Sequence, residues 1–200
     1  MTSRLEVLRS SWPPAARLAM AGWCLLVCLM LWGPPARAGN VDLPLIETSR
    51  TEEGVLLSFT VRFELTKAVE DALQKGVPLH FIAEADLYRY RWYWRDKRVA
   101  NASRSWRLAY QPLTRRYKVS FGSLSQTYES LPEALAAVQR VVRWRLADPL
   151  AAGDDNYYLE FRYRLDTAQL PRPLQIGVGG QADWDLSVER KLQVPEVAVR

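Results

Sequence analysis

The chain has 200 residues, a formal net charge of +5, two cysteines and one histidine. The first 38 residues supply +3 of that charge, so residues 39–200 carry only +2, with 23 basic against 21 acidic side chains. Both cysteines, Cys24 and Cys28, also lie in that first segment. The rest of the chain therefore has no disulfide and no cysteine metal site, and its small basic excess excludes a nucleic-acid-binding class.

The first 38 residues have the layout of an export signal. Three arginines precede an apolar run over residues 18–32, and an A-x-A cleavage motif ends at Ala38. The run is shorter than the roughly 20 residues that usually span a bilayer, which favours a cleaved signal peptide and a periplasmic location. An uncleaved inner-membrane anchor is the alternative. We expect residues 39–200 to form a single exported globular domain.

The chain after the signal begins with a hairpin and a short helix. Residues 41–50 and 54–65 are predicted strands, because apolar and polar side chains alternate in the second run, and Gly54 is placed to supply a positive φ in the turn. Thr66 is a typical N-cap for a helix over residues 66–75. Gly76 follows as its C-terminal stop.

A meander of three antiparallel strands is expected next, over residues 79–95, 98–111 and 115–122. The reversal falls at Asp96-Lys97. A two-residue turn there would set arginines opposite one another across the first two strands, which is unfavourable and favours a bulge or a longer turn.

A second helix and two further strands complete the expected order. Ser130 and Glu133 form a capping box for a helix over residues 131–147, whose apolar side chains make one stripe. Residues 157–166 alternate as a strand, and a last strand is expected near 184–192. The fold class is α+β, mainly antiparallel β, with about seven strands in a sheet or sandwich and two helices.

The stretch "DLYRYRWYWRDKR" (86–98) packs five aromatic and five basic residues into thirteen positions. On a strand, alternation puts four of the aromatic side chains on one face and the basic ones, together with Leu87 and Tyr93, on the other. We interpret the aromatic face as part of the core, since burying four such rings would contribute on the order of 10 kcal/mol. The aromatic face consists of Tyr88, Tyr90, Trp92 and Trp94. The candidate partner-binding residues are Arg89, Arg91 and Arg95, with Arg104 and Arg107 on the returning strand.

No pattern in residues 39–200 predicts catalysis. His80, the one histidine, has no motif around it and is interpreted as structural. The turn "GDDN" (153–156) lacks most of a calcium loop, and "GVGG" (177–180) is followed by a predicted strand where a phosphate-binding loop needs a helix. We expect no enzyme, no cofactor and no metal.

Five segments together resemble one known family. They are "GVPLHFIAEADLYRYRWYWRDKRV", "RLAYQPLTRRYKVS", "SLPEAL", "YRLDTAQLPRPLQI" and "DWDLS", in this order. They are similar to DUF4390, a family of small exported bacterial proteins of unknown function. The resemblance implies a single exported domain, found mostly in proteobacteria and often encoded beside a nitrogen-type sensor kinase and its regulator. It implies no catalytic residues.

These observations favour a non-enzymatic periplasmic binding domain. Its expected partner is an envelope protein or an anionic envelope component. A link to a membrane sensor kinase is one form that this function could take. The alternative is an anion or lipid-headgroup module that uses the basic face of residues 87–95. Nucleic acid is not an expected partner. Contact with the membrane is expected only through the N-terminal segment, if that segment is uncleaved.

Overall fold

A computed structural model describes residues 41–93, 95–150, 156–171 and 181–195 of the chain. Four sequence predictions fall outside these residues: the signal peptide with its cleavage after Ala38, the burial of Trp94, most of the acidic turn at 153–156, and the glycine loop at 177–180. The division of the chain at residue 38 also stays a prediction.

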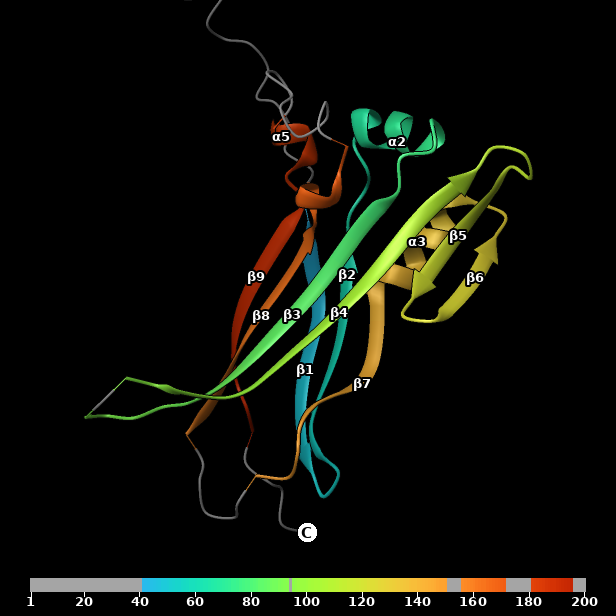
Figure 1. Ribbon diagram of the computed structural model, residues 1–200. Helices are drawn as coiled ribbons and strands as arrows, with labels where there is room; N and C mark the ends of the chain where they lie inside the picture. Colours follow the sequence, from blue (N-terminus) through green and yellow to red (C-terminus); the bar gives the residue numbers. More distant parts are fainter. Residues whose placement is uncertain (1–40, 94, 151–155, 172–180, 196–200) are drawn as a thin grey trace, which may run out of the picture. The chain divides into compact units, whose positions relative to one another are not determined.

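The described strands form two antiparallel sheets (Figure 1). The smaller sheet has the order β1-β2-β7, and the larger has the order β6-β5-β4-β3-β8-β9. The expected class, α+β and mainly antiparallel β, is confirmed, with nine strands among the described residues. Their bounds are β1 Asp42–Thr51, β2 Gly54–Arg62, β3 Leu79–Arg89, β4 Lys97–Gln111, β5 Arg116–Phe121, β6 Leu124–Tyr128, β7 Arg140–Ala147, β8 Tyr157–Leu165 and β9 Ser187–Gln193.

The two predicted supersecondary units are both present. Strands β1 and β2 form the expected hairpin, and β3, β4 and β5 form the expected meander, which β6 extends by one strand. Gly54 has φ +119°, as its place in the turn predicts, and a Cβ there would overlap the carbonyl oxygen of Ala147 in β7. The position therefore needs glycine for two reasons, its backbone angle and the close approach of a neighbouring strand.

Short helices connect the strands. Helix α2, Lys67–Gln74, begins after Thr66, whose hydroxyl oxygen accepts from the Val69 N–H at 3.4 Å, and Gly76 follows it with φ +90°. Helix α3, Leu131–Gln139, begins after Ser130, whose side chain accepts from the Glu133 N–H. Both predicted caps are confirmed. The 3₁₀ turn η1, Thr167–Gln169, and the short helix α5, Gln181–Trp184, precede β9.

The predicted helix over residues 131–147 is wrong in its second half. Helix α3 ends at Gln139, and the next eight residues form β7, which pairs with β2. A register shift between Leu57 and Phe59 accompanies a positive φ of 51° at Arg143. Val141 and Trp144 are buried in the core, and the bulge leaves two consecutive exposed residues between them. The strand therefore has the three-residue apolar spacing that is typical of a helix.

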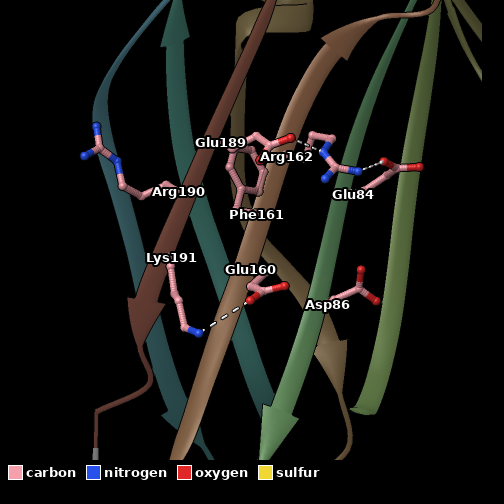
Figure 2. A pocket seen from close by; sticks show the side chains of 8 residues that line it. All are labelled: Glu84, Asp86, Glu160, Phe161, Arg162, Glu189, Arg190 and Lys191. Atoms are coloured by element: carbon pink, nitrogen blue, oxygen red, sulfur yellow. Dashed lines mark hydrogen bonds and ion pairs between the residues drawn. The ribbon is translucent and has the colours of Figure 1, made fainter. Parts of the chain in front are cut away.

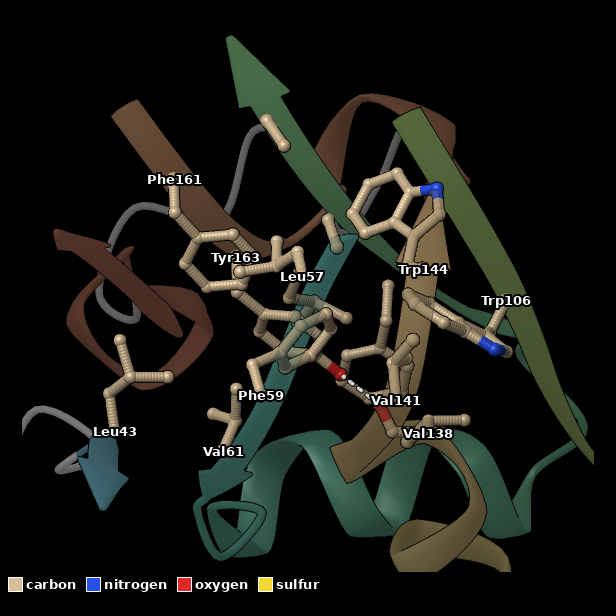
Figure 3. Close-up of a cluster of buried hydrophobic side chains, with 14 of the residues drawn as sticks. Leu43, Leu57, Phe59, Val61, Trp106, Val138, Val141, Trp144, Phe161 and Tyr163 are labelled. Carbon is tan, nitrogen blue, oxygen red and sulfur yellow. Dashed lines mark hydrogen bonds between the residues drawn. The ribbon is translucent and has the colours of Figure 1, made fainter. Parts of the chain in front are cut away.

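The core lies between the two sheets and is rich in rings (Figure 3). Phe59 of β2 contacts Phe161 of β8 with ring centroids 4.7 Å apart and lies 6.5 Å from Trp144 of β7. Tyr163 of β8 is fully buried, and its hydroxyl donates to the Val138 carbonyl at 3.2 Å, which ties the end of α3 to the larger sheet.

The smaller sheet covers only part of the larger one, and each side closes differently. On one side β1 approaches β9, and the Thr48 hydroxyl donates to the Gln193 carbonyl at 3.5 Å. On the other side α3 packs against β5 and β6 of the larger sheet and also contacts β2 and β7 of the smaller one (Figure 1).

The predicted core face is wrong for Tyr88, Tyr90 and Trp92. In β3 the buried side chains are those at odd positions, so Leu87 faces the core and Tyr88 lies on the opposite, polar face. The strand also ends at Arg89, because β4 begins at Lys97 and β8 at Tyr157, so no strand pairs with the described residues that follow it. The expectation of a bulge or a longer turn is confirmed, since the register shifts after Leu87 and seven residues, 90–96, separate the end of β3 from the start of β4. The odd-numbered core row is Leu79, Phe81, Ala83, Ala85 and Leu87.

Candidate binding surface at the β3–β4 loop

The β3–β4 loop, residues 90–96, carries the most exposed aromatic side chains of the described chain. Trp92 is 84% exposed, Tyr93 68% and Tyr90 56%. The rings of Trp92 and Tyr93 meet edge to face, with centroids 5.3 Å apart. Figure 1 shows the end of the β3–β4 hairpin extending away from its neighbours in the sheet. We call the three exposed rings the aromatic tip.

Asp96 holds this loop in its conformation. One oxygen of its carboxylate accepts from the Arg91 N–H at 3.0 Å, closing the loop upon itself, and the other accepts from the Tyr158 hydroxyl at 2.8 Å. The Tyr158 hydroxyl and then the Arg91 N–H, both donating to the carboxylate, lower the pKa of Asp96. On the far side, the Tyr90 N–H donates to the Asn156 carbonyl at 2.8 Å.

Tyr158 is the base on which the loop rests. Its ring is buried and stacks on Tyr88 at 5.2 Å, and the ammonium group of Lys191 lies 3.7 Å from the centroid of the same ring. Burial, followed by the hydrogen bond to Asp96, raises the pKa of its hydroxyl, so Tyr158 is the neutral donor of that pair at ordinary pH. The exposed tip therefore stands on an ordered support of two strands.

The loop also carries positive charge around a small hollow. A hollow of about 260 Å³ is lined by Arg89, Tyr90, Arg91, Trp92, Tyr93 and Asn156. Within residues 89–97 there are four cations, and the one acidic side chain, Asp96, is already bonded within the support. Guanidinium groups beside aromatic faces suit an anionic group with an apolar neighbour.

The structure brings together three of the five predicted binding arginines. Arg89 ends β3, Arg91 is half-buried in the loop, and Arg95 is exposed just before β4. The other two lie elsewhere in the fold. Arg104 and Arg107 are separated from the loop because the longer turn shifts the register, pairing Ala83 with Arg104 and His80 with Arg107.

Arg104 lies on the inner face of the larger sheet. Its guanidinium carbon is 5.3 Å from the ring centroid of Phe121 and 5.1 Å from that of Trp144, so it bridges the two sheets through cation–π contacts. Burial lowers its pKa. The position indicates a packing role for this side chain.

A second hollow, of about 380 Å³, lies on the outer face of the larger sheet (Figure 2). Its charges pair across neighbouring strands: Lys191 with Glu160 at 3.5 Å, and Arg162 with both Glu189 and Glu84. Figure 2 shows these pairs as rungs between strands. Most of the charges that line this hollow are therefore already paired with one another, and exposed pairs of this kind contribute weakly to stability.

His80 lies at the other end of the same hairpin from the loop. It is half-buried near the start of β3, and burial and then the positive charge of Arg107 lower the pKa of its imidazole. The described residues contain no group of three or more histidine, cysteine, aspartate or glutamate side chains placed to hold a metal ion. They also contain no helix long and apolar enough to cross a bilayer.

The fold and the loop together define a class: a two-sheet antiparallel α+β domain that displays aromatic and basic side chains on one supported loop. A family model described as "Domain of unknown function (DUF4390)" matches residues 38–193. The chain belongs to this family, as the resemblance predicted. No curated protein and no solved structure matches it.

The residues that sequence reasoning missed are the exposed rings and their support. Trp92 and Tyr90 were assigned to the core face, Tyr93 to the basic face, and Asp96 only to the turn. Extending the alternation back to Leu79 would have placed Leu87 in the core row and Tyr88 on the polar face. No local sequence pattern marks Tyr158, because its contact with Asp96 joins residues 62 positions apart.

Proposed function

We propose that this is a non-enzymatic, exported binding domain whose recognition element is the β3–β4 loop. One observation carries the proposal: three aromatic side chains stand exposed on a loop whose backbone is fixed by Asp96, Asn156 and Tyr158. Exposing such rings forgoes the free energy of burying them, and large exposed aromatics with neighbouring arginines are typical of binding hot spots.

The fixed conformation supports binding in a second way. A loop that is already ordered loses less conformational entropy when it meets a partner than a flexible one does. The export-like layout of the N-terminal residues and the lack of catalytic motifs motivate the periplasmic location and the non-enzymatic role. The family resemblance motivates a link to a membrane sensor kinase.

A site-specific crosslinking experiment tests the loop as the recognition element. A photoreactive phenylalanine analogue replaces Tyr93 in the full chain, expressed in cells, and crosslinked envelope components are identified by mass spectrometry, lipids included. The matched control carries the analogue at Leu113, which is fully exposed in the β4–β5 turn. We expect products at position 93 that are absent at 113. Identical products at both positions would contradict the proposal.

A further inference from the structure

We propose that the β3–β4 loop binds the surface of a bilayer that contains anionic phospholipid, with the aromatic tip at the level of the headgroups and the loop arginines on their phosphates. This inference rests on the proposed function and names the partner for the same loop.

The aromatic tip has the chemistry of the membrane interface. Tryptophan and tyrosine side chains concentrate where lipid meets water, because each combines an apolar ring with a polar group. Trp92 and Tyr93 are adjacent in the chain, are exposed by 84% and 68%, and meet edge to face at the end of the loop. Two rings presented together can enter the headgroup layer without moving any part of the core.

The charges around the tip complement an anionic surface. Arg91, Arg95 and Lys97 lie within seven residues, against the single carboxylate of Asp96, which accepts two hydrogen bonds inside the loop support. The electrostatic attraction of an anionic leaflet is worth about 1 kcal/mol per nearby basic side chain. Arginine adds geometry, because its planar fork can bond two phosphate oxygens at once.

The hollow beside the rings favours a headgroup over a broad protein surface. It has a volume of about 260 Å³ and is lined by both kinds of side chain, with Arg91 between Tyr90 and Trp92. A lipid phosphate in this hollow would contact the arginine side chain, and the upper part of the acyl chains would contact the aromatic rings. A standard protein interface buries about 800 Å² on each partner, which is more surface than a single short loop offers.

Vesicle binding with a local readout tests this inference. The full chain, purified as the cell leaves it, is mixed with vesicles of phosphatidylcholine alone or of equal parts phosphatidylcholine and phosphatidylglycerol, some containing brominated acyl chains. A chain that retains the apolar residues 18–32 could bind vesicles through that segment, whatever the loop does. Quenching of Trp92 is therefore taken as the difference between wild type and Trp92→Phe, which reports the tip itself.

The expected result has three parts. Trp92 is quenched by the phosphatidylglycerol vesicles and much less by the neutral ones, and added salt weakens the effect. Arg91→Gln and Arg95→Gln each weaken the Trp92 signal about fivefold, whereas the control Lys67→Gln, an exposed cation on α2, leaves it unchanged. A Tyr93→Ser substitution weakens it further, and its control Leu113→Ser does not.

Several outcomes would overturn the inference. One is equal Trp92 quenching by anionic and neutral vesicles; another is no quenching in either. Full displacement by soluble glycerol 3-phosphate would indicate a soluble anion as the ligand. If the vesicles fail while position 93 still crosslinks to a protein, the loop recognises a protein and the proposed function stands without the bilayer. Failure of both experiments removes the function as well.

Discussion

Strand β8 and the β3–β4 loop are alike in composition, but the aromatic side chains of β8 are buried and those of the loop are exposed. The segment "YYLEFRYRL" of β8 alternates aromatic with charged residues, as does "YRYRWY" from Tyr88 to Tyr93. In β8 the rings of Phe161 and Tyr163 are essentially fully buried, whereas in the loop Trp92 is 84% exposed. The difference lies in the neighbours: β8 is paired on both sides, by β3 and β9, and residues 90–96 have no strand on either side. Alternation places side chains on two faces, but pairing decides whether either face is covered.

The largest effect is expected when a ring is removed from the β8 side of this comparison. Tyr163 contacts Phe59, Phe63, Phe81 and Trp106, so Tyr163→Ala should lower the free energy of unfolding by about 4 kcal/mol, through lost burial and the cavity left behind. Urea denaturation followed by circular dichroism measures it.

Tyr163→Phe is the matched control for that substitution. It keeps the ring and removes only the hydroxyl that donates to the Val138 carbonyl, so the expected loss is about 1 kcal/mol. Equal losses for the two substitutions would show that the hydrogen bond, and not the packing, makes Tyr163 important.

The next effect concerns the support of the loop. Asp96→Ala removes the acceptor for both the Arg91 N–H and the Tyr158 hydroxyl, so residues 90–96 should open more often. Trypsin cleaves after arginine, and cutting at Arg91 and Arg95 should become several-fold faster, as mass spectrometry of the fragments can measure.

Tyr158→Phe is the graded version of the same test. It keeps the ring stacked on Tyr88 and removes one of the two hydrogen bonds, so trypsin cleavage should rise less than in Asp96→Ala. If trypsin cleaves Asp96→Ala no faster than wild type, the loop is held by something other than this carboxylate.

Protonation should affect the two ends of the β3–β4 hairpin at different pH. The pKa of His80 is lowered from 6.5 in the folded chain, so the unfolded chain binds the extra proton first and stability falls as the pH drops below 6.5. The pKa of Asp96 is lowered from 3.8, so its contribution is intact above 3.8 and is lost only as the pH falls through the folded value.

Unfolding measured by urea between pH 8 and pH 5 checks the first window. The chain has a single histidine, so NMR titration of its imidazole signal is unambiguous. His80→Gln should remove the decline near 6.5 without changing loop cleavage by trypsin at pH 7. A decline that persists in His80→Gln would assign it to another group.

The smallest effect on stability is expected at the aromatic tip. Trp92→Ser combined with Tyr93→Ser removes two rings that touch each other but not the core, so the free energy of unfolding should change by less than about 0.5 kcal/mol. Urea denaturation of this variant beside Tyr163→Ala compares the two regions directly. A loss of several kcal/mol at the tip would mean that the rings are covered in solution.

The sequence predicts the hairpin, the meander and both helix caps, because each depends on residues close together in the chain. Thr66, Ser130 and Gly54 act through their nearest backbone groups, and such local rules need no knowledge of the rest of the fold. The class of the fold follows from the same patterns.

The errors arise where distant residues decide. Residues 140–147 have an apolar spacing compatible with a helix, but pairing with β2 and the bulge at Arg143 make them a strand, and tertiary contacts override such propensities. Two residues of the aromatic tip, Tyr90 and Trp92, were misassigned for a related reason. Whether residues 90–96 have a partner depends on where β4 and β8 begin, and neither start can be read from the stretch itself.

The pairings at the centre of both sheets have a consequence for the time course of folding. β3 pairs with β8 through residues 68 to 84 positions apart, Phe81 and Leu165 being the most distant pair, and β2 pairs with β7 over 80 to 92 positions. Contacts of this range are slow to form, with milliseconds to seconds typical of such topologies. Strand β2 therefore keeps one open edge until β7 (residues 140–147) joins it, and β3 keeps one until β8 (residues 157–165) does.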